Sequence, residues 1–114
     1  MLRIYHNHRC SKSRAALALL QQHGVEVEVI HYLDTPPSAA ELTELLRQLG
    51  LRPRDLLRHG EAEYKSLGLD DPSLGDDALI SAMVTHPKLI ERPIVTAHGK
   101  AVIGRPAEAV LTLL

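Results

Sequence analysis

The sequence predicts an α/β fold built on a four-stranded mixed sheet, and three patterns indicate it. Near the N-terminus, two strand-like segments flank a helical segment. In the middle of the chain, leucines recur at helical spacing. Near the C-terminus, two apolar runs flank His98-Gly99, which is typical of a hairpin turn. The predicted order is β-α-β, several helices, and then β-β-α.

The first segments form a predicted βαβ unit. Val25, Val27 and Val29 alternate with glutamates, as in a strand, and Gly24 is placed to end the preceding helix. The predicted elements are a strand over 2–6, a polar loop over 7–13, a helix over 14–23 and a strand over 25–33. Two strands joined by one helix pair in parallel through a right-handed crossover.

The remaining segments complete the fold. Ser38 and Glu41 form a predicted capping box, leucines follow up to Gly50, and Pro106 suits the first position of the last helix. The further predicted elements are helices over 54–59, 61–67 and 73–86, strands over 93–97 and 100–104, and a helix over 107–114. This order is typical of a thioredoxin-like fold with a helical insert between its βαβ and ββα halves. We expect a single domain spanning residues 1–114.

The composition narrows the class of protein. Thirteen basic residues nearly balance fourteen acidic ones, so bulk charge predicts neither a nucleic-acid nor a membrane partner. A lone cysteine forms no internal disulfide, and the N-terminus lacks the apolar region of a signal peptide. We therefore expect a reducing, cytoplasmic location.

The loop around Cys10 carries the predicted chemistry. Cys10 lies between the first strand and the first helix, where backbone N–H groups and the helix dipole favour a thiolate. Arg9, Lys12 and Arg14 add positive charge nearby. These effects predict a thiol pKa below the ordinary value, whereas a buried, inert cysteine is the alternative.

Two neighbours of Cys10 leave alternatives open. Ser13 completes a C-x-x-S sequence, so an oxidised Cys10 would need an outside thiol for its reduction; the hydroxyl also suits a bond to the backbone. His6 either hydrogen-bonds the loop or the sulfur, or has no role. His6, His8 and Cys10 alternate along the chain, but their spacing is loose for a zinc site, and we predict no metal.

Nine arginines are present, and three of them lie at element boundaries: Arg58, Arg92 and Arg105. Guanidinium groups suit oxyanions, but composition alone does not choose among the nine. The bond before Pro93 is a candidate cis peptide, since the loop before the third strand of a thioredoxin fold lies beside the cysteine loop.

Several separated motifs resemble those of one family. They are H-N-x-R-C-S-K-S-R, Y-L-D-T-P-P, R-D-L-L-R, Y-K-S-L-G-L, H-P-K-L-I-E-R-P-I-V and I-G-R-P. In this order they resemble the glutaredoxin-coupled arsenate reductase (ArsC) family over essentially the whole chain. The C-S-K-S-R form resembles a reductase-related branch.

The resemblance implies the roles of particular residues. It places the nucleophile on Cys10 and the three oxyanion-binding arginines on Arg58, Arg92 and Arg105. It places thiolate-supporting roles on His6, Ser13 and Arg14, and it leaves His8 where the family has proline.

The resemblance also implies an activity. Arsenate would be reduced to arsenite with glutathione as co-substrate and glutaredoxin as partner, without a bound metal or organic cofactor. The alternatives are an Spx-like regulator that binds RNA polymerase, a monothiol glutaredoxin-like protein, and a related thiol reductase with another substrate.

Overall fold

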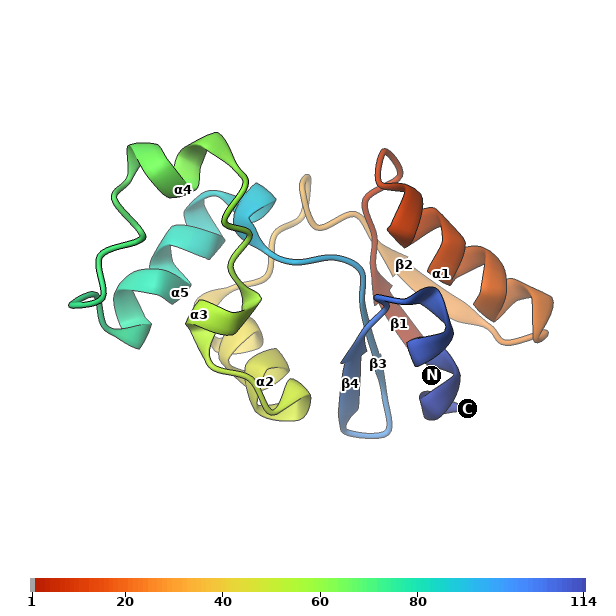
Figure 1. Cartoon of the computed structure of the whole chain (residues 1–114). Helices are drawn as coiled ribbons and strands as arrows, with labels where there is room; N and C mark the ends of the chain where they lie inside the picture. The colour runs from red at the N-terminus through yellow and green to blue at the C-terminus, as the bar shows by residue number, and fades with distance from the viewer. Residues whose placement is uncertain (1) are drawn as a thin grey trace. The chain divides into compact units, whose positions relative to one another are not determined.

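The computed structural model describes residues 2–114, which divide into two compact units. The sheet unit comprises the chain up to residue 35 together with residues 92–114, and the helical unit comprises residues 36–91. The helical unit is the insert that the sequence predicts between the two halves of the sheet (Figure 1). That the chain behaves as a single domain stays a prediction.

The sheet unit contains the predicted four-stranded mixed sheet of a thioredoxin-like fold. Its strands are β1 (Leu2–Tyr5), β2 (Val27–Ile30), β3 (Ile94–Ala97) and β4 (Lys100–Ile103). The order across the sheet is β2-β1-β3-β4, with β1 parallel to β2 and the other pairs antiparallel. Ile4 lies between Val29 and Val95 in the register, so the centre of the sheet is aliphatic.

Strand β2 is shorter at both ends than the predicted 25–33. At its start, the N–H groups of Gly24 and Val25 donate to Gln21 and Leu20, and Gly24 has a φ of 69°. This is the Schellman arrangement that ends a helix, and it confirms the predicted role of Gly24 while it takes Val25 out of the strand. After the strand, a turn begins in which Asp34 and Thr35 donate to the carbonyl of His31.

Helix α1 (Ser11–Gln22) begins three residues before the predicted start. The N–H of Arg14 donates to the carbonyl of Cys10, which makes Cys10 the residue that precedes the first turn. No side-chain cap marks this start, so the sequence pattern did not reveal it. Ala16 and Leu20 of the helix pack in the core against β1 and β3.

The C-terminal segment differs from the prediction in helix type. Residues Ala107–Leu113 form a 3₁₀ helix rather than an α-helix, and Pro106 precedes it instead of occupying its first position. Val110 and Leu113 complete the same core, and this segment packs against α1. The hairpin before it is confirmed: His98 and Gly99 have φ values of 55° and 76°, as a two-residue turn requires.

The predicted capping box is present in the helical unit, and the helices after it are shorter than predicted. It contains α2 (Ala39–Leu49), α3 (Pro53–Leu56), α4 (Ala62–Ser66), α5 (Asp76–Thr85) and the 3₁₀ turn η1 (Pro87–Leu89). The Glu41 N–H donates to Ser38 Oγ at 3.1 Å, and the Ser38 N–H donates to Glu41 Oε1 at 3.2 Å. Helix α5 begins after the predicted 73, because Ser73 instead bonds Asp71 Oδ1 through its N–H and its hydroxyl.

Two short segments of this unit pair with each other. Helix α3 ends before the predicted residue 59, since Leu57 forms an antiparallel bridge with Ile90. The N–H of Arg58 donates to the carbonyl of Leu89, and that of Glu91 donates to Leu56. No helix within residues 2–114 is long and apolar enough to cross a membrane.

Candidate active site

Cys10 lies at the junction of the loop after β1 and the start of α1. The loop turns tightly before it: the Cys10 N–H donates to the carbonyl of Asn7 at 3.0 Å, and the Arg9 N–H donates to Asn7 Oδ1 at 3.0 Å. Cys10 is 8% exposed. The thiol is therefore largely shielded from water, yet it lies at a helix N-terminus, where N–H groups stay available for an anion.

The surroundings of Cys10 favour its thiolate. Burial alone raises the pKa of the thiol, but the backbone N–H of Ser13, the Arg92 guanidinium and the backbone N–H of Lys12 together lower this pKa below its ordinary value. The lowered pKa confirms the prediction from the sequence. The cause differs in part, because the charge comes from Arg92 and Lys12 acts through its backbone.

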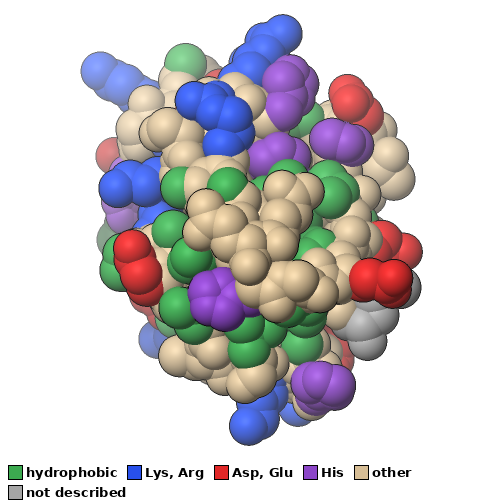
Figure 2. Space-filling model, turned by 90° about the vertical axis from the view of Figure 1, so that its right-hand side faces the viewer, with side chains coloured by type: hydrophobic (Ala, Val, Ile, Leu, Met, Phe, Trp, Pro, Cys, Tyr) green, Lys and Arg blue, Asp and Glu red, His purple; other side chains and the backbone are tan. Residues whose placement is uncertain are grey.

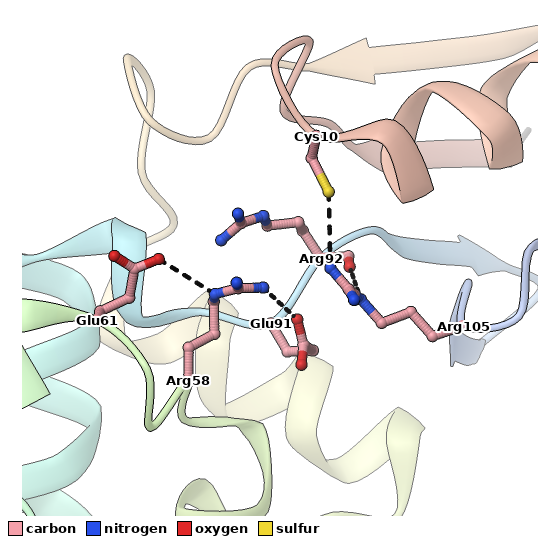
Figure 3. Close-up of polar contacts among 6 residues, drawn as sticks. All are labelled: Cys10, Arg58, Glu61, Glu91, Arg92 and Arg105. Atoms are coloured by element: carbon pink, nitrogen blue, oxygen red, sulfur yellow. Dashed lines mark hydrogen bonds and ion pairs between the residues drawn. The ribbon is translucent and has the colours of Figure 1, made fainter.

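Two arginines of the sheet unit meet at the sulfur. Arg105 Nη2 donates to Cys10 Sγ at 3.6 Å, and Arg105 Nε donates to the carbonyl of Arg92 at 2.7 Å (Figure 3). The Arg92 guanidinium also lowers the pKa of the Cys10 thiol. The predicted proximity of Cys10, Arg92 and Arg105 is thus present within one unit, and it forms a compact cationic surrounding for an anion.

The backbone that carries these arginines is closely packed. The Gly104 N–H donates to the carbonyl of Pro93 at 2.9 Å, and a Cβ on Gly104 would lie 2.8 Å from Pro93 Cγ. Glycine is therefore needed directly before Arg105. The Arg92–Pro93 bond, whose isomer the sequence left open, is cis, and so is the Arg105–Pro106 bond, which was not among the predicted candidates.

Ser13 and His6 support the loop rather than the sulfur directly. His6 Nδ1 and Ser13 Oγ share a hydrogen bond of 2.6 Å, and Ser13 Oγ accepts from the Asn7 N–H at 3.1 Å. Both residues are buried. Burial, with the added effects of His31, His8 and Arg14, lowers the pKa of His6 below its ordinary value.

Arg14 contacts the same loop from outside. Its Nη1 donates to the carbonyl of His8 at 2.9 Å, and its side chain is exposed. Arg14 therefore braces the backbone at His8. Basic and histidine side chains gather at the upper edge of the face that Figure 2 shows, the edge at which this loop lies.

A small hollow adjoins the loop on the histidine side. It encloses about 170 Å³ and is lined by His6, Asn7, His8, Arg9, His31, Leu33 and Asp34. The His31 ring lies 6.0 Å from that of His6 and 6.5 Å from that of His8. Despite these rings, residues 2–114 contain no group of three or more His, Cys, Asp or Glu side chains arranged to hold a metal ion.

Arg58 belongs to the helical unit and has acidic partners. Its Nε lies 3.3 Å from Glu61 Oε1, and its Nη1 lies 2.7 Å from Glu91 Oε1 (Figure 3). Sequence reasoning missed both glutamates. A signal was available, because Glu61 lies three residues after Arg58 in the sequence and Glu91 directly precedes Arg92.

Comparison with known proteins gives the family. A sequence model described as the ArsC family matches residues 5–113. The chain belongs to the ArsC family. An ArsC-family arrangement thus accounts for the thioredoxin-like sheet, the inserted helices and the cysteine at the start of α1.

Relatives of the ArsC-family chain match it over nearly full length. An arsenate reductase of Neisseria meningitidis is 52% identical, and the alignment covers 99% of this chain and 97% of that protein. The Escherichia coli protein YfgD is 57% identical, with 99% and 96% covered. The structure of an arsenate reductase from Vibrio cholerae superposes with a TM-score of 0.97 at 54% identity, covering 99% of this chain and 97% of that one.

Proposed function

We propose that the chain reduces arsenate to arsenite through Cys10, with glutathione as the electron donor and glutaredoxin as the partner that regenerates the thiol. The observation that carries this proposal is the buried Cys10 thiol, which accepts a hydrogen bond from Arg105 and whose pKa Arg92 helps to hold below the ordinary value. A nucleophilic sulfur beside two guanidinium groups suits attack on a tetrahedral oxyanion. Arsenate reductases among the relatives support arsenate as that oxyanion.

The first step forms a sulfur–arsenic bond. The Cys10 thiolate attacks the arsenic of dihydrogen arsenate, one arsenate oxygen takes up a proton and leaves as water, and a thiol–arsenate adduct remains. Arg92 and Arg105 neutralise charge on the oxygens, and Arg58 is proposed as a third oxyanion ligand from the resemblance. The N–H groups at the start of α1 hold the sulfur until it attacks.

The second step moves two electrons from sulfur to arsenic, and the third step regenerates the Cys10 thiol from the disulfide that remains. The glutathione sulfur attacks the Cys10 sulfur, the electron pair of the sulfur–arsenic bond stays on arsenic, and arsenite leaves with the glutathione proton. Cys10 is left in a mixed disulfide with glutathione. A glutaredoxin thiolate then attacks the glutathione sulfur of this disulfide. The glutathione is transferred to glutaredoxin, and the Cys10 thiol is released. His6, Ser13 and Arg14 act as positioning residues for the loop, and the steps use no bound cofactor.

The cell compartment follows from the electron donor. Glutathione keeps thiols reduced in the cytoplasm, so this proposal places the protein there.

The test is arsenate-dependent NADPH oxidation in an assay coupled through glutathione, glutathione reductase and glutaredoxin. Cys10→Ser should abolish turnover, whereas Ser11→Ala, which alters an exposed hydroxyl beside it, should not. Mass spectrometry of the enzyme without glutaredoxin should show glutathione on Cys10. Arsenate reduction by Cys10→Ser would refute the proposal, and turnover without glutathione would refute the assigned donor.

A further inference from the structure

Arg58 donates to two carboxylates at once. Glu61 takes Nε–H, and Glu91 takes an Nη1–H at 2.7 Å. The Arg58 side chain is 23% exposed, and the two glutamate side chains are 26% and 28% exposed. Partial burial weakens the screening by water and salt, so these pairs exceed ordinary surface ion pairs in strength.

The backbone of the helical unit holds these partners together. Leu57 and Ile90, which precede Arg58 and Glu91, form an antiparallel bridge. The Arg58 N–H donates to Leu89 at 2.8 Å, and the Glu91 N–H donates to Leu56 at 3.0 Å. The Arg58–Glu91 contact is therefore fixed by main-chain pairing, not left to two long side chains.

The charge of this cluster opposes a further anion. Glu61 and Glu91 hold two negative charges against the Arg58 guanidinium, and like charges repel an anion. The bonds to Glu61 and Glu91 also occupy two of the five N–H donors of the Arg58 guanidinium. An oxyanion that approaches Arg58 must displace a carboxylate or bind beside two like charges, and both lower its affinity.

We propose that Glu91, assisted by Glu61, is an intramolecular competitor for Arg58 and thereby sets the affinity of the protein for its oxyanion substrate. The inference rests on the proposed function, which assigns Arg58 to oxyanion binding. The two glutamates act through Arg58 and are positioning residues. They weaken the affinity for the oxyanion substrate and leave the reactions of the Cys10 sulfur unchanged.

The kinetic test uses Glu91→Gln, which keeps the shape of the side chain and removes its charge. The KM for arsenate should fall about fivefold, with kcat changed less than about twofold. Glu44→Gln is the matched control, because it removes the charge from an exposed ion pair with Arg47 in the same unit and should leave KM unchanged. A KM that stays constant or rises in Glu91→Gln overturns the proposal.

A binding test separates this inference from the proposed function. Inorganic phosphate is a tetrahedral oxyanion like arsenate. It is titrated without thiols into the wild-type protein and into Glu91→Gln, and its binding is followed by amide NMR. Tighter phosphate binding by Glu91→Gln supports competition even where the protein reduces no arsenate. Equal phosphate affinities, or no binding by either protein, overturn the competition whatever the turnover assay shows.

A second variant guards against a folding defect. Glu61→Gln removes the other carboxylate without altering the segment that pairs with Leu57, and it should lower the KM for arsenate in the same direction by a smaller factor. Thermal unfolding of each variant identifies the one that retains the native fold. A folded Glu61→Gln protein with a higher KM also overturns the proposal.

Discussion

The arginines of the two units lie in opposite electrostatic surroundings. In the sheet unit, Arg105 donates to a cysteine sulfur and to a main-chain carbonyl, and Arg92 helps to lower the thiol pKa. In the helical unit, Arg58 is neutralised by Glu61 and Glu91. Each of the three lies in a segment that resembles a family motif. The comparison shows that a motif fixes where an arginine is, whereas its neighbours decide how strongly it attracts an anion.

The largest expected effect comes from removing a cation at the sulfur. Arg92→Ala should raise the pKa of the Cys10 thiol and lower kcat/KM for arsenate about 100-fold, since both the thiolate and the oxyanion lose a partner. Iodoacetamide alkylation at a series of pH values measures the thiol. Arg3→Ala, which disrupts an exposed pair with Glu28 in the same unit, is the control. An unchanged alkylation profile in Arg92→Ala would remove the contrast between the units.

A smaller effect is expected from crowding the backbone that carries Arg105. Gly104→Ala places a Cβ 2.8 Å from Pro93 Cγ, and relieving the clash should cost about 2 kcal/mol of unfolding free energy. Urea unfolding measures it. Gly60→Ala in the helical unit, where a Cβ meets nothing within 4 Å, should cost much less. Equal losses at both positions would show that close packing is not special to the sheet unit.

Loss of the buried Ser13 hydroxyl should lower the free energy of unfolding somewhat less than Gly104→Ala does. Ser13→Ala leaves the Asn7 N–H and His6 Nδ1 without this partner, at a cost of about 1 kcal/mol of unfolding free energy. The exposed Ser66→Ala in the helical unit should be nearly neutral by the same measurement. Wild-type stability in Ser13→Ala would contradict the role of this hydroxyl in holding the loop.

The smallest effect is a pH dependence of stability from His6. Its pKa in the folded protein is lowered, chiefly by burial, so the unfolded chain binds a proton first as the pH falls. Stability from this group is therefore fully present above the ordinary histidine pKa of about 6.5 and is lost below it. Urea unfolding from pH 8 to pH 5 should show a weaker decline in His6→Asn than in His23→Asn, which alters an exposed ring. Identical declines would refute this assignment.

Local patterns predicted much of the fold. The alternating valines, the Ser38 capping box, Gly24 and the His98-Gly99 turn each correspond to a backbone feature of the structure. These signals are short-range, because one or two side chains decide the conformation of their own neighbours. The start of α1 has no such side chain, and its prediction was wrong by three residues.

The candidate site was predictable only where its causes are local. The position of Cys10 at a helix start follows from the order of the elements, and the part of the lowered thiol pKa that comes from backbone N–H groups follows from that position, whereas the part that comes from Arg92 does not. The partners of Arg58 depend on the pairing of Leu57 with Ile90, which lie far apart in the sequence. No periodicity reports such a pairing, so the competing carboxylates became visible only in the structure.

Two backbone amides near Cys10 provide an NMR signal of the charge on its sulfur. The N–H groups of Lys12 and Ser13 lower the pKa of this thiol, so they interact more strongly with the sulfur when it carries a negative charge. Their proton resonances should therefore move together as the thiol titrates, and should shift again when the sulfur acquires arsenic or glutathione. Each stage of a turnover would thus be distinguishable on isotope-labelled protein without any added probe.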